Sequence, residues 1–527
     1  MKYFVIAATC CFSFSSYAWD VPDLLIGKEG LAQKVQHVEL SQGVNLYNVV
    51  RGSSSNEGFL LSSGPLEQDA LNDYTNKLKT ASQKFSLEDT PELTPDGKKI
   101  DNILRIRGFN TQEEATNVLN KLKEDGLNFS VRAAAQDGYP TTGPFEISIL
   151  RVDLSQYKGK VQTILAQDQL IGAETVTSMA SRSDAVAAVN GGFFAFNDKV
   201  GDLGAPAGIF VNDGNLMREA ANGRPVVVLD NSGKSTKVDI ATSVSSELKL
   251  KVNGGELISV DGMNRKPGVI LNCGGYGDSP TNQVVHDFVC NDEDEIIVYN
   301  QFYGKNTPSG DGTEIVVDSK GQVIETRNVR GTQIEPGMMY IQSTGKHALE
   351  IKKSDKVVLD SSILIDGQKV ALKPNVSMFS AGPTLIQNSD YADEYRMTQG
   401  WSAYPSIGAV EGAQDDDGIG GQSKSQNREN FYNGWVLRRH PRTALGTTKD
   451  NVLYAVVVYG RQSGKTEGAN ITEMSRLMKA LGADKAINLD GGGSSMMFAN
   501  GSSTGSSSDA VERKVSDAVV FLKDIDL

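Results

Sequence analysis

The segment Ile487-Asn488-Leu489-Asp490-Gly491-Gly492-Gly493-Ser494-Ser495 carries the strongest signal in the sequence. A short apolar strand ends in an acidic residue, and three consecutive glycines follow it. Such glycines let backbone N–H groups approach a ligand closely, as in an anion-binding nest. The segment is not a P-loop, because it lacks the Gly-Lys-Ser/Thr ending. Taken alone, it fits either an anion-binding loop or a tight hairpin that needs positive φ angles.

Three other clusters have the same character, with small or polar residues directly after an apolar strand, where loops hold functional groups at the edge of a sheet. They are Ala187-Ala188-Val189-Asn190-Gly191-Gly192-Phe193-Phe194, Ser380-Ala381-Gly382-Pro383-Thr384-Leu385 and Arg438-Arg439-His440-Pro441-Arg442-Thr443-Ala444-Leu445-Gly446. In the third, Arg442 fits either a bidentate contact with phosphate or a cap on strand carbonyls. His440 fits an acid/base role, although a single loop histidine is more often structural.

Beyond residue 144 the chain is rich in strand patterns. The clearest are residues 145–152, 226–229, 295–299 and 452–459. A helix is predicted from Asn470, where Glu473 completes a capping box and apolar residues such as Met474 repeat at helical spacing. A stretch rich in Gly, Asp, Ser, Gln and Asn at 411–434 predicts a long surface loop. These patterns predict a large, mixed, strand-rich α+β domain over residues 145–527.

A weak internal repeat precedes this domain. Asn76-Lys77-Leu78-Lys79 recurs as Asn120-Lys121-Leu122-Lys123, and residues 85–87 recur in the same way at 129–131. A strand at 103–107 leads into the second helix, where Thr111 and Glu114 form a capping box. The pattern predicts a small doubled β-α-β domain at residues 40–136, with helices covering one sheet face. A turn-rich linker, residues 137–144, follows it.

The N-terminus predicts export. Lys2, an apolar run over residues 3–14 and Ser16-Tyr17-Ala18 form a secretory signal peptide, residues 1–18, cut after Ala18. The run is short of the roughly 18–20 residues needed to span a bilayer. No later segment is long and apolar enough, so we expect a periplasmic or secreted bacterial protein without a membrane span.

Composition excludes some partners. The 527 residues are 39% hydrophobic, and 65 acidic residues against 52 basic ones give a net charge of −13. Such a chain has no general attraction to nucleic acid or anionic lipid.

After removal of the predicted signal peptide, Cys273 and Cys290 remain of the four cysteines. An even pair in an exported protein favours a disulfide, and the lone nearby His286 makes a metal site less favoured.

In this order, the four clusters resemble the phosphodiester glycosidase family. The matching motifs are Asn-Gly-Gly-Phe-Phe at 190–194, Ala-Gly-Pro at 381–383, Arg-Thr-Ala-Leu-Gly at 442–446 and Asn-Leu-Asp-Gly-Gly-Gly-Ser-Ser at 488–495, with Gly-Arg-Gln at 460–462. The resemblance covers residues 145–527. It implies hydrolysis of the bond between the anomeric carbon of a sugar and an esterified phosphate, like that of an N-acetylglucosamine-1-phosphodiester α-N-acetylglucosaminidase.

The resemblance suggests roles for individual residues. The departing phosphomonoester is a good leaving group, so charge and N–H donors around phosphate matter more than its protonation. We assign this task to Arg442, helped by the backbone of the fourth cluster. The oxocarbenium-like transition state needs a carboxylate, for which Asp490 is the first candidate and Glu467 the second. The expected substrate-binding residues are Asn190, Gly191, Gly192, Arg461, Gly491, Gly492, Gly493 and Ser494.

The chain also departs from the family pattern. Tyr459 stands where the family often has Asp, and Glu467 where it usually has a small residue. These departures leave the choice of catalytic carboxylate open. Asp415-Asp416-Asp417-Gly418 suggests calcium, but Ile419 breaks the EF-hand template. We therefore favour a solvated loop and expect no cofactor.

The small domain resembles the SPOR domain, which binds peptidoglycan glycan strands. The matching residues are 106–109, 113–115 and 122–127. This resemblance implies a module that tethers the chain to peptidoglycan, and the alternative is a generic ferredoxin-like spacer.

The combined hypothesis is an exported glycosidase that cleaves a sugar-1-phosphodiester in a cell-envelope or extracellular glycan. One alternative is a non-catalytic envelope protein that binds peptidoglycan or another glycan. Another is a phosphodiesterase that cuts on the other side of the phosphate. The sugar, the aglycone and the stereochemistry are left open.

Overall fold

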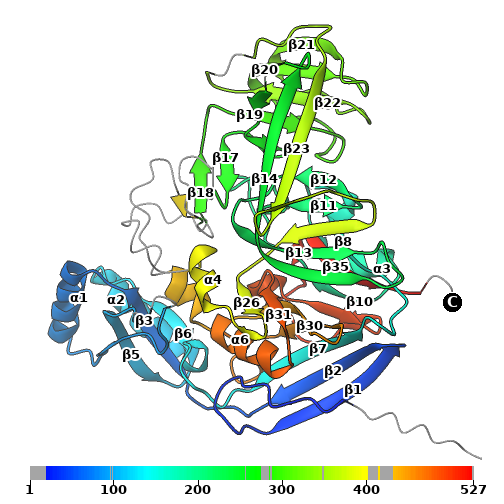
Figure 1. Cartoon of the computed structure of the whole chain (residues 1–527). Helices are drawn as coiled ribbons and strands as arrows, with labels where there is room; N and C mark the ends of the chain where they lie inside the picture. Colours follow the sequence, from blue (N-terminus) through cyan, green and yellow to red (C-terminus); the bar gives the residue numbers. More distant parts are fainter. Residues whose placement is uncertain are drawn as a thin grey trace, which may run out of the picture.

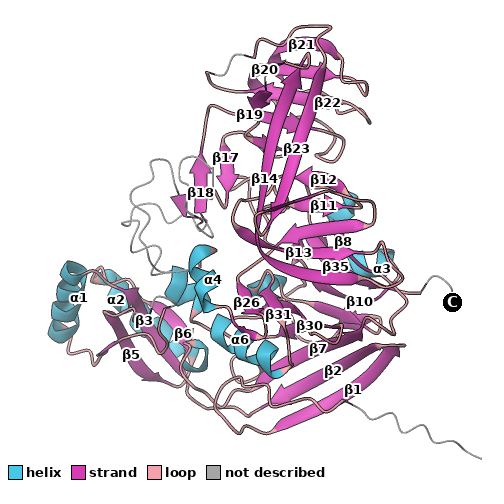
Figure 2. Cartoon of the chain, viewed as in Figure 1, coloured by secondary structure: helices cyan, strands magenta, loops and turns pink. Residues whose placement is uncertain are grey.

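The computed structural model describes residues 19–524 apart from 95–96, 98, 256, 274–283, 285–287, 347–348, 402–413 and 416–430. The predicted signal peptide, most of the predicted loop at 411–434 and residues 416–418 of the suggested calcium motif therefore lie outside the described residues. The molecule is a strand-rich α+β protein, which confirms the predicted fold class (Figure 2).

A long antiparallel sheet carries the site. Its strands, in spatial order, are β1 (Gln33–Ser41), β2 (Val44–Arg51), β7 (Phe145–Asp153), β30 (Val452–Val458), β29 (Arg442–Thr447), β31 (Lys485–Asn488), β26 (Thr384–Gln387) and β27 (Asp390–Tyr391). Side chains alternate between its two faces, as the pleat requires. In β30, Val456 and Val458 face one core, whereas Ala455 and Val457 face the other.

Helix α6 (Ile471–Ala480) covers one face of this sheet (Figure 1). It begins at the predicted capping box. The Asn470 side chain accepts a hydrogen bond from the backbone N–H of Glu473, and the Glu473 side chain accepts one from the backbone N–H of Asn470. Met474, Leu477 and Met478 are fully buried against the sheet. The apolar face of the predicted helix is therefore part of the hydrophobic core.

Two further sheets pack on the opposite face. The first contains β33 (Ser502–Ser503), β32 (Met497–Ala499), β10 (Ala185–Asn190), β35 (Asp517–Leu522) and β8 (Val161–Leu165), and α3 (Val176–Arg182) covers its outer side. The second contains β12 (Asn215–Arg218), β11 (Phe210–Asn212), β25 (Val376–Ser380), β13 (Arg224–Asp230), β14 (Lys237–Val252), β23 (Val357–Ile365) and β24 (Gln368–Val370), with β15 (Leu257–Ser259) beside β14. All three sheets contribute to one central hydrophobic core.

Strands β14 and β23 extend away from this core into a separate lobe, drawn at the top of Figure 1. The sheet of the lobe contains β16 (Gly262–Met263), β19 (Ile296–Tyr299), β22 (Met339–Ser343), β20 (Gly310–Val317) and β21 (Val323–Arg330). The ends of β14 and β23 supply Leu250 and Val357 to its core. Outside this lobe, β9 (Glu174–Thr175) and β34 (Lys514–Val515) form a two-stranded antiparallel sheet near α3.

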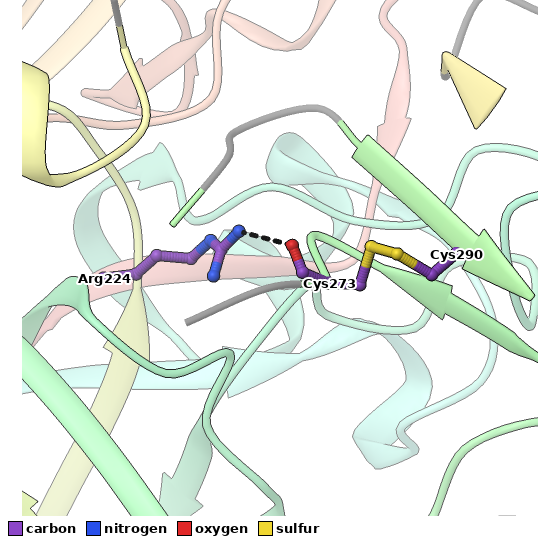
Figure 3. Close-up of a disulfide and its surroundings, with 3 residues drawn as sticks. All are labelled: Arg224, Cys273 and Cys290. Carbon is purple, nitrogen blue, oxygen red and sulfur yellow. Dashed lines mark hydrogen bonds between the residues drawn. A yellow bond between two sulfur atoms is a disulfide. The ribbon is translucent and has the colours of Figure 1, made fainter. Parts of the chain in front are cut away.

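The predicted disulfide is confirmed between Cys273 and Cys290, whose Cα atoms are 5.8 Å apart. It joins the end of β17 (Val269–Leu271) to β18 (Phe288–Asn291), which also pairs with β28 (Gln414–Asp415). Both cysteines are buried, and Nη2 of Arg224 donates to the Cys273 carbonyl at 3.5 Å (Figure 3). The bridge therefore lies next to β13 of the second packing sheet.

The small domain is a β-α-β-β-α-β unit. Its elements are β3 (Phe59–Pro65), α1 (Gln68–Thr80), β4 (Ser86–Glu88), β5 (Ile103–Phe109), α2 (Gln112–Glu124) and β6 (Ser130–Ala133). The antiparallel strand order is β4-β5-β3-β6, and both helices pack on one face through residues such as Leu78 and Leu122. The predicted capping box at Thr111 and Glu114 begins α2.

This domain is inserted between two neighbouring strands of the large sheet. β2 pairs with β7 along its whole length, from Val44 opposite Val152 to Arg51 opposite Phe145. Residues 44–51, which the predicted boundary at residue 40 groups with the small domain, therefore belong to the large sheet. Among the helices that the structure describes, none combines the length and apolar character needed to cross a bilayer.

Candidate active site

The four sequence clusters meet at one edge of the large sheet. The backbone N–H of Asp490, in the fourth cluster, donates to the Gly191 carbonyl of the first at 3.1 Å. Asn488 exchanges backbone hydrogen bonds with Gly382 and Pro383 of the second cluster, at 2.8 and 2.9 Å. Motifs separated by hundreds of residues therefore form a single loop cluster.

Asn190 connects these loops. Its Nδ2 donates to the Asp490 carbonyl at 2.9 Å, and its Oδ1 accepts from Oγ1 of Thr443 at 2.7 Å and from the Met496 N–H at 3.2 Å. The side chain is fully buried. We predicted a substrate contact for Asn190, but the structure places its amide inside the protein, where it holds three of the clusters together.

The glycines fall into two groups. A Cβ atom on Gly191 would lie 1.9 Å from Oδ2 of Asp517, and one on Gly192 would lie 2.3 Å from the Ser380 carbonyl. These two glycines allow close packing within the protein. Gly491 also packs closely, because a Cβ there would lie 3.1 Å from the Pro441 carbonyl and 3.2 Å from the Trp435 ring.

Gly492 and Gly493 instead face arginines. Gly492 has φ of +62°, and a Cβ there would lie 3.1 Å from both terminal nitrogens of Arg461. On Gly493 it would lie 2.3 Å from Nη2 of Arg513, which pairs with Asp509 at 2.9 Å. Gly492 and Gly493 begin the 3-10 turn Gly492–Ser494. The backbone of this turn therefore lies next to the two guanidinium groups.

Asp490 lies at the start of this turn and is partly exposed. Its Oδ1 accepts from the Gly491 N–H at 2.7 Å, which holds the carboxylate against the glycine loop. Its negative charge raises the pKa of both Arg442 and Arg461, partly offsetting the effect of their burial. The structure thus brings the first predicted catalytic carboxylate together with both predicted arginines.

Arg442 is fully buried beneath the site. Its Nε donates to the Ala469 carbonyl at 3.1 Å, Nη2 donates to the Trp435 carbonyl, and the guanidinium carbon lies 4.4 Å from the centre of the Trp435 ring. Nη1 has no hydrogen-bond partner among the described residues. Burial, with the charge of Arg461, lowers the pKa of Arg442 to about 9.

His440 positions Arg461. Its Nδ1 accepts from Nε and Nη2 of Arg461, and its Nε2 lies 2.7 Å from the Gly434 carbonyl. Burial and the charges of Arg442, Arg461 and Arg438 lower the pKa of His440 well below 6.5. The imidazole is therefore neutral, and both of its nitrogens are in use within the protein.

Asp517 is a second carboxylate of the site, which we did not predict from sequence. It begins β35, is 1% exposed, and accepts from the Gly192 N–H through Oδ2 at 3.3 Å. Burial, reinforced by the charge of Asp490, raises its pKa to about 7. The only sequence signal for it was an acidic residue at the start of an apolar strand.

Trp435 was also missed. It is half-buried, its ring packs over Arg442 and beside Gly491, and it lies 5.0 Å from the His440 ring. An aromatic ring beside a polar loop is a typical surface for a sugar. No motif placed it, because it lies in a short π-helical turn, Tyr432–Val436, at the end of the predicted loop.

Glu467, the second candidate carboxylate, is hydrogen-bonded to residues outside the glycine loop. Its Oε1 accepts from the Gly464 N–H at 2.7 Å and its Oε2 from Nε2 of Gln136 at 3.0 Å. It is 1% exposed, and burial raises its pKa. The structure therefore places this candidate at the contact with residues that follow the small domain. Tyr459, the other departure from the family pattern, is buried with its hydroxyl 2.8 Å from Oγ1 of Thr504.

The described part of the chain contains no group of three or more His, Cys, Asp and Glu side chains placed to hold a metal ion. The groups that the described residues bring to the site are two carboxylates in different environments, several guanidinium groups and backbone donors.

Solved structures with a similar fold include the following two. A solved structure from Burkholderia pseudomallei, named a candidate exported protein, is 28% identical, with a TM-score of 0.84 over 96% of this chain and 99% of that one. A hypothetical protein from Synechocystis shares the fold at 14% identity, with a TM-score of 0.51 over 93% of this chain and 75% of that one.

A curated relative matches a shorter stretch. The SPbeta prophage-derived protein YomE of Bacillus subtilis is 37% identical over 83 residues, which span 16% of this chain and only 13% of YomE. The family comparison reaches further, because the model for phosphodiester glycosidases matches residues 294–522, which include the third and fourth clusters. The C-terminal part of the chain is therefore similar to phosphodiester glycosidases.

Proposed function

We propose that this protein is an exported hydrolase that cleaves the bond between the anomeric carbon of a sugar and the phosphate of a sugar-1-phosphodiester in a cell-envelope or extracellular glycan. The observation that carries the proposal is the meeting of Asp490, Arg461 and Arg442 at the glycine loop. A carboxylate next to fixed positive charge suits a reaction in which a sugar cation develops and a phosphate leaves.

In this mechanism Arg461 and the backbone of the glycine turn bind the phosphate, and Arg442 supports them from below. Preorganised positive charge and N–H donors are effective because the developing charge on the leaving phosphate needs no further reorganisation. The partly exposed Asp490 faces the anomeric carbon, as nucleophile, base or electrostatic partner. The Trp435 ring provides an apolar surface for the sugar.

Asp517 acts through Asp490. Two neighbouring carboxylates do not ionise independently, and the buried one holds its proton to higher pH. With a pKa of about 7, Asp517 is largely neutral in mildly acidic solution, so Asp490 can carry the negative charge alone. Asp517 is thus a positioning and charge-tuning residue in this proposal.

Export and attachment complete the proposal. Residues 1–18 serve as the signal peptide, and the disulfide and the Burkholderia structure, named a candidate exported protein, support an oxidising compartment. The β-α-β-β-α-β domain binds peptidoglycan glycan strands and thereby holds the enzyme near its substrate. This role rests on the sequence resemblance of residues 106–127 together with the fold of that domain.

The test is product analysis with the purified mature chain and a sugar-1-phosphodiester. We expect free sugar from the wild type, and a loss of about 100-fold or more in kcat/KM for Asp490→Asn and Arg461→Gln, with a loss also for Arg442→Ala. Asp360→Asn, an exposed carboxylate on β23, is the matched control.

Other products have a defined meaning. Sugar-1-phosphate instead of free sugar would identify a phosphodiesterase that cuts on the other side. Equal release by the wild type, Asp490→Asn and Arg461→Gln would refute the site. If the folded chain turned over no sugar-1-phosphodiester, a glycan-binding role without catalysis would replace the proposal.

A further inference from the structure

A cluster of arginines lies where the small domain meets the candidate active site. Arg105, Arg132 and Arg438 surround the single carboxylate of Asp137, and we call these four residues the arginine junction. Nε of Arg105 lies 2.8 Å from Oδ2 of Asp137, Nη1 of Arg132 lies 3.7 Å from Oδ1, and Nε of Arg438 lies 4.0 Å from Oδ1. Asp137 itself is almost fully buried.

The pairing in this junction is uneven. Arg105 has a second acidic partner, because its Nη1 lies 3.0 Å from Oε2 of Glu88. Among the described residues, Arg132 and Arg438 have Asp137 as their only acidic partner, at these longer distances, and Nε of Arg132 also donates to Oγ of Ser130 at 2.9 Å. Nη1 of Arg132 and Nε of Arg438 are both buried and have no hydrogen-bond partner among the described residues. Buried donors without partners are costly, so such atoms point to a ligand that supplies acceptors.

The charge of the junction is also unbalanced. Burial lowers the pKa of Arg438 to about 9, with the charge of Arg132 adding to the effect and Asp137 only partly offsetting it. The side chains of Arg132 and Arg438 are only 11% and 18% exposed. Positive charge that only one shared carboxylate offsets costs folding free energy in such surroundings, and a further anion would compensate it.

The junction adjoins the site that we propose for phosphodiester cleavage. The Arg438 carbonyl accepts from Nη2 of Arg442 at 3.5 Å, and the charge of Arg461 further lowers the pKa of Arg438. The chain path explains this proximity, because Arg438 lies four residues before Arg442, the first residue of β29, whereas Arg132 comes from β6 of the small domain. The small domain therefore brings an arginine next to the catalytic loops.

We propose that Arg132 and Arg438 bind a second phosphate of the substrate, so that the natural substrate is a polymer in which sugar and phosphodiester units repeat. A guanidinium pair matches the geometry and charge of a phosphodiester, and two such groups from different domains form a subsite. This inference rests on the proposed function, since the first phosphate is the one whose bond to the anomeric carbon is cleaved at Asp490.

The test compares two synthetic substrates. One is the methyl phosphodiester of N-acetylglucosamine-1-phosphate, which has one phosphate, and the other is its extension by a second phosphodiester-linked N-acetylglucosamine unit. We compare the kcat/KM ratio of the longer to the shorter substrate for the wild type, Arg132→Gln, Arg438→Gln and Arg438→Lys. Arg476→Gln is the matched control, because Arg476 is 46% exposed, lies on α6 and pairs with Glu92 instead of Asp137.

Arg132→Gln and Arg438→Gln are each expected to lower this ratio about tenfold, the effect of losing one charge-assisted contact. Arg438→Lys is expected to recover part of the ratio and Arg476→Gln to keep it, with melting temperatures showing that each variant folds. An unchanged ratio in both glutamine variants would overturn the inference.

A titration with tripolyphosphate keeps the test independent of turnover. Calorimetric binding to the wild type that weakens about tenfold in both glutamine variants, but not in Arg476→Gln, supports the subsite even if neither substrate is cleaved. In that case only the proposed function fails. Equal binding by all variants would overturn the subsite, whatever the activity.

Discussion

Nδ1 of His440 accepts hydrogen bonds from both Nε and Nη2 of Arg461, at 3.1 and 3.0 Å. Since a guanidinium can only donate, this imidazole nitrogen has no proton, and Nε2 donates to the Gly434 carbonyl at 2.7 Å. The neutral histidine thus fixes the orientation of an arginine that lies against Gly492. His440 is a positioning residue for Arg461.

Acidification is expected to destabilise the protein through His440. Burial and three nearby arginines lower its pKa in the folded state well below 6.5. As the pH falls through 6.5, His440 binds a proton in the unfolded chain but stays neutral in the folded protein. The free energy of unfolding therefore decreases. Melting temperatures of the wild type and His440→Asn between pH 8 and 5 test this, and the variant is expected to lose less. His37→Asn, an exposed histidine on β1, is the control; equal acid sensitivity of wild type and His440→Asn would contradict the prediction.

Asp517 is expected to have the opposite effect on stability. Burial, with the charge of Asp490, raises its pKa from 3.8 to about 7. Between these values the folded protein holds a proton that the unfolded chain releases, so this contribution to stability decreases as the pH rises. Asp517→Asn removes the titration, and its melting temperature relative to the wild type is therefore expected to be more favourable at pH 8 than at pH 5. A constant difference across this range would show that Asp517 does not titrate there.

The same residue is expected to shape the pH profile of catalysis. Ionisation of Asp517 near pH 7 places a second negative charge beside Asp490. In the wild type, kcat is expected to change with an apparent pKa close to this value, and Asp517→Asn is expected to lack that transition. Profiles of kcat between pH 5 and 9 measure it, with Asp360→Asn as the control, and a transition that persists in Asp517→Asn would exclude this residue as its source.

Gly191→Ala is expected to destabilise the protein by about 1–3 kcal/mol, the usual cost of overpacking. The new Cβ would lie 1.9 Å from Oδ2 of Asp517, in a position where neither backbone nor carboxylate can move freely. Gly434→Ala is the control, because a Cβ there meets no described atom within 4 Å. Chemical denaturation measures both variants, and a neutral Gly191→Ala would mean that the loop around Asp517 adapts easily.

Replacing Cys273 and Cys290 together by serine is expected to cost about 2–4 kcal/mol, since the bridge closes a loop between cysteines 17 positions apart. The melting temperature of the oxidised wild type is expected to exceed that of the double variant, and reduction of the wild type is expected to remove most of the difference. If reduction leaves the melting temperature unchanged, the bridge contributes little to the stability of this region.

Local signals in the sequence predicted much of the fold. The capping boxes at Thr111 and Asn470 begin α2 and α6, because such boxes depend only on residues within one helical turn. Long apolar runs such as residues 452–458 became central strands, since both faces of the large sheet are covered. The disulfide was predicted from the two cysteines that remain after the predicted signal peptide, in a chain expected to be exported.

The pairing of distant segments could not be predicted in this way. Nothing local to residues 44–51 indicates that their partner is β7, on the far side of the small domain. In the site, Asp490 acts electrostatically on Arg442 and Arg461, but the motifs indicated neither the burial of Asn190 nor the hydrogen bond between Gln136 and Glu467. Asp517 could not be predicted as a site residue, because its raised pKa depends on the residues that surround it in the fold and not on its neighbours in sequence.

The insertion of the small domain between β2 and β7 has a mechanical consequence. Arg51 and Phe145 are opposite each other across the two strands, so the domain is anchored at both of its ends to adjacent points of one sheet. A force on the domain is therefore divided between two strands. To pull both strands out of the sheet, this force must shear β2 from β1 and β7 from β30, because β2 and β7 are loaded together in the same direction.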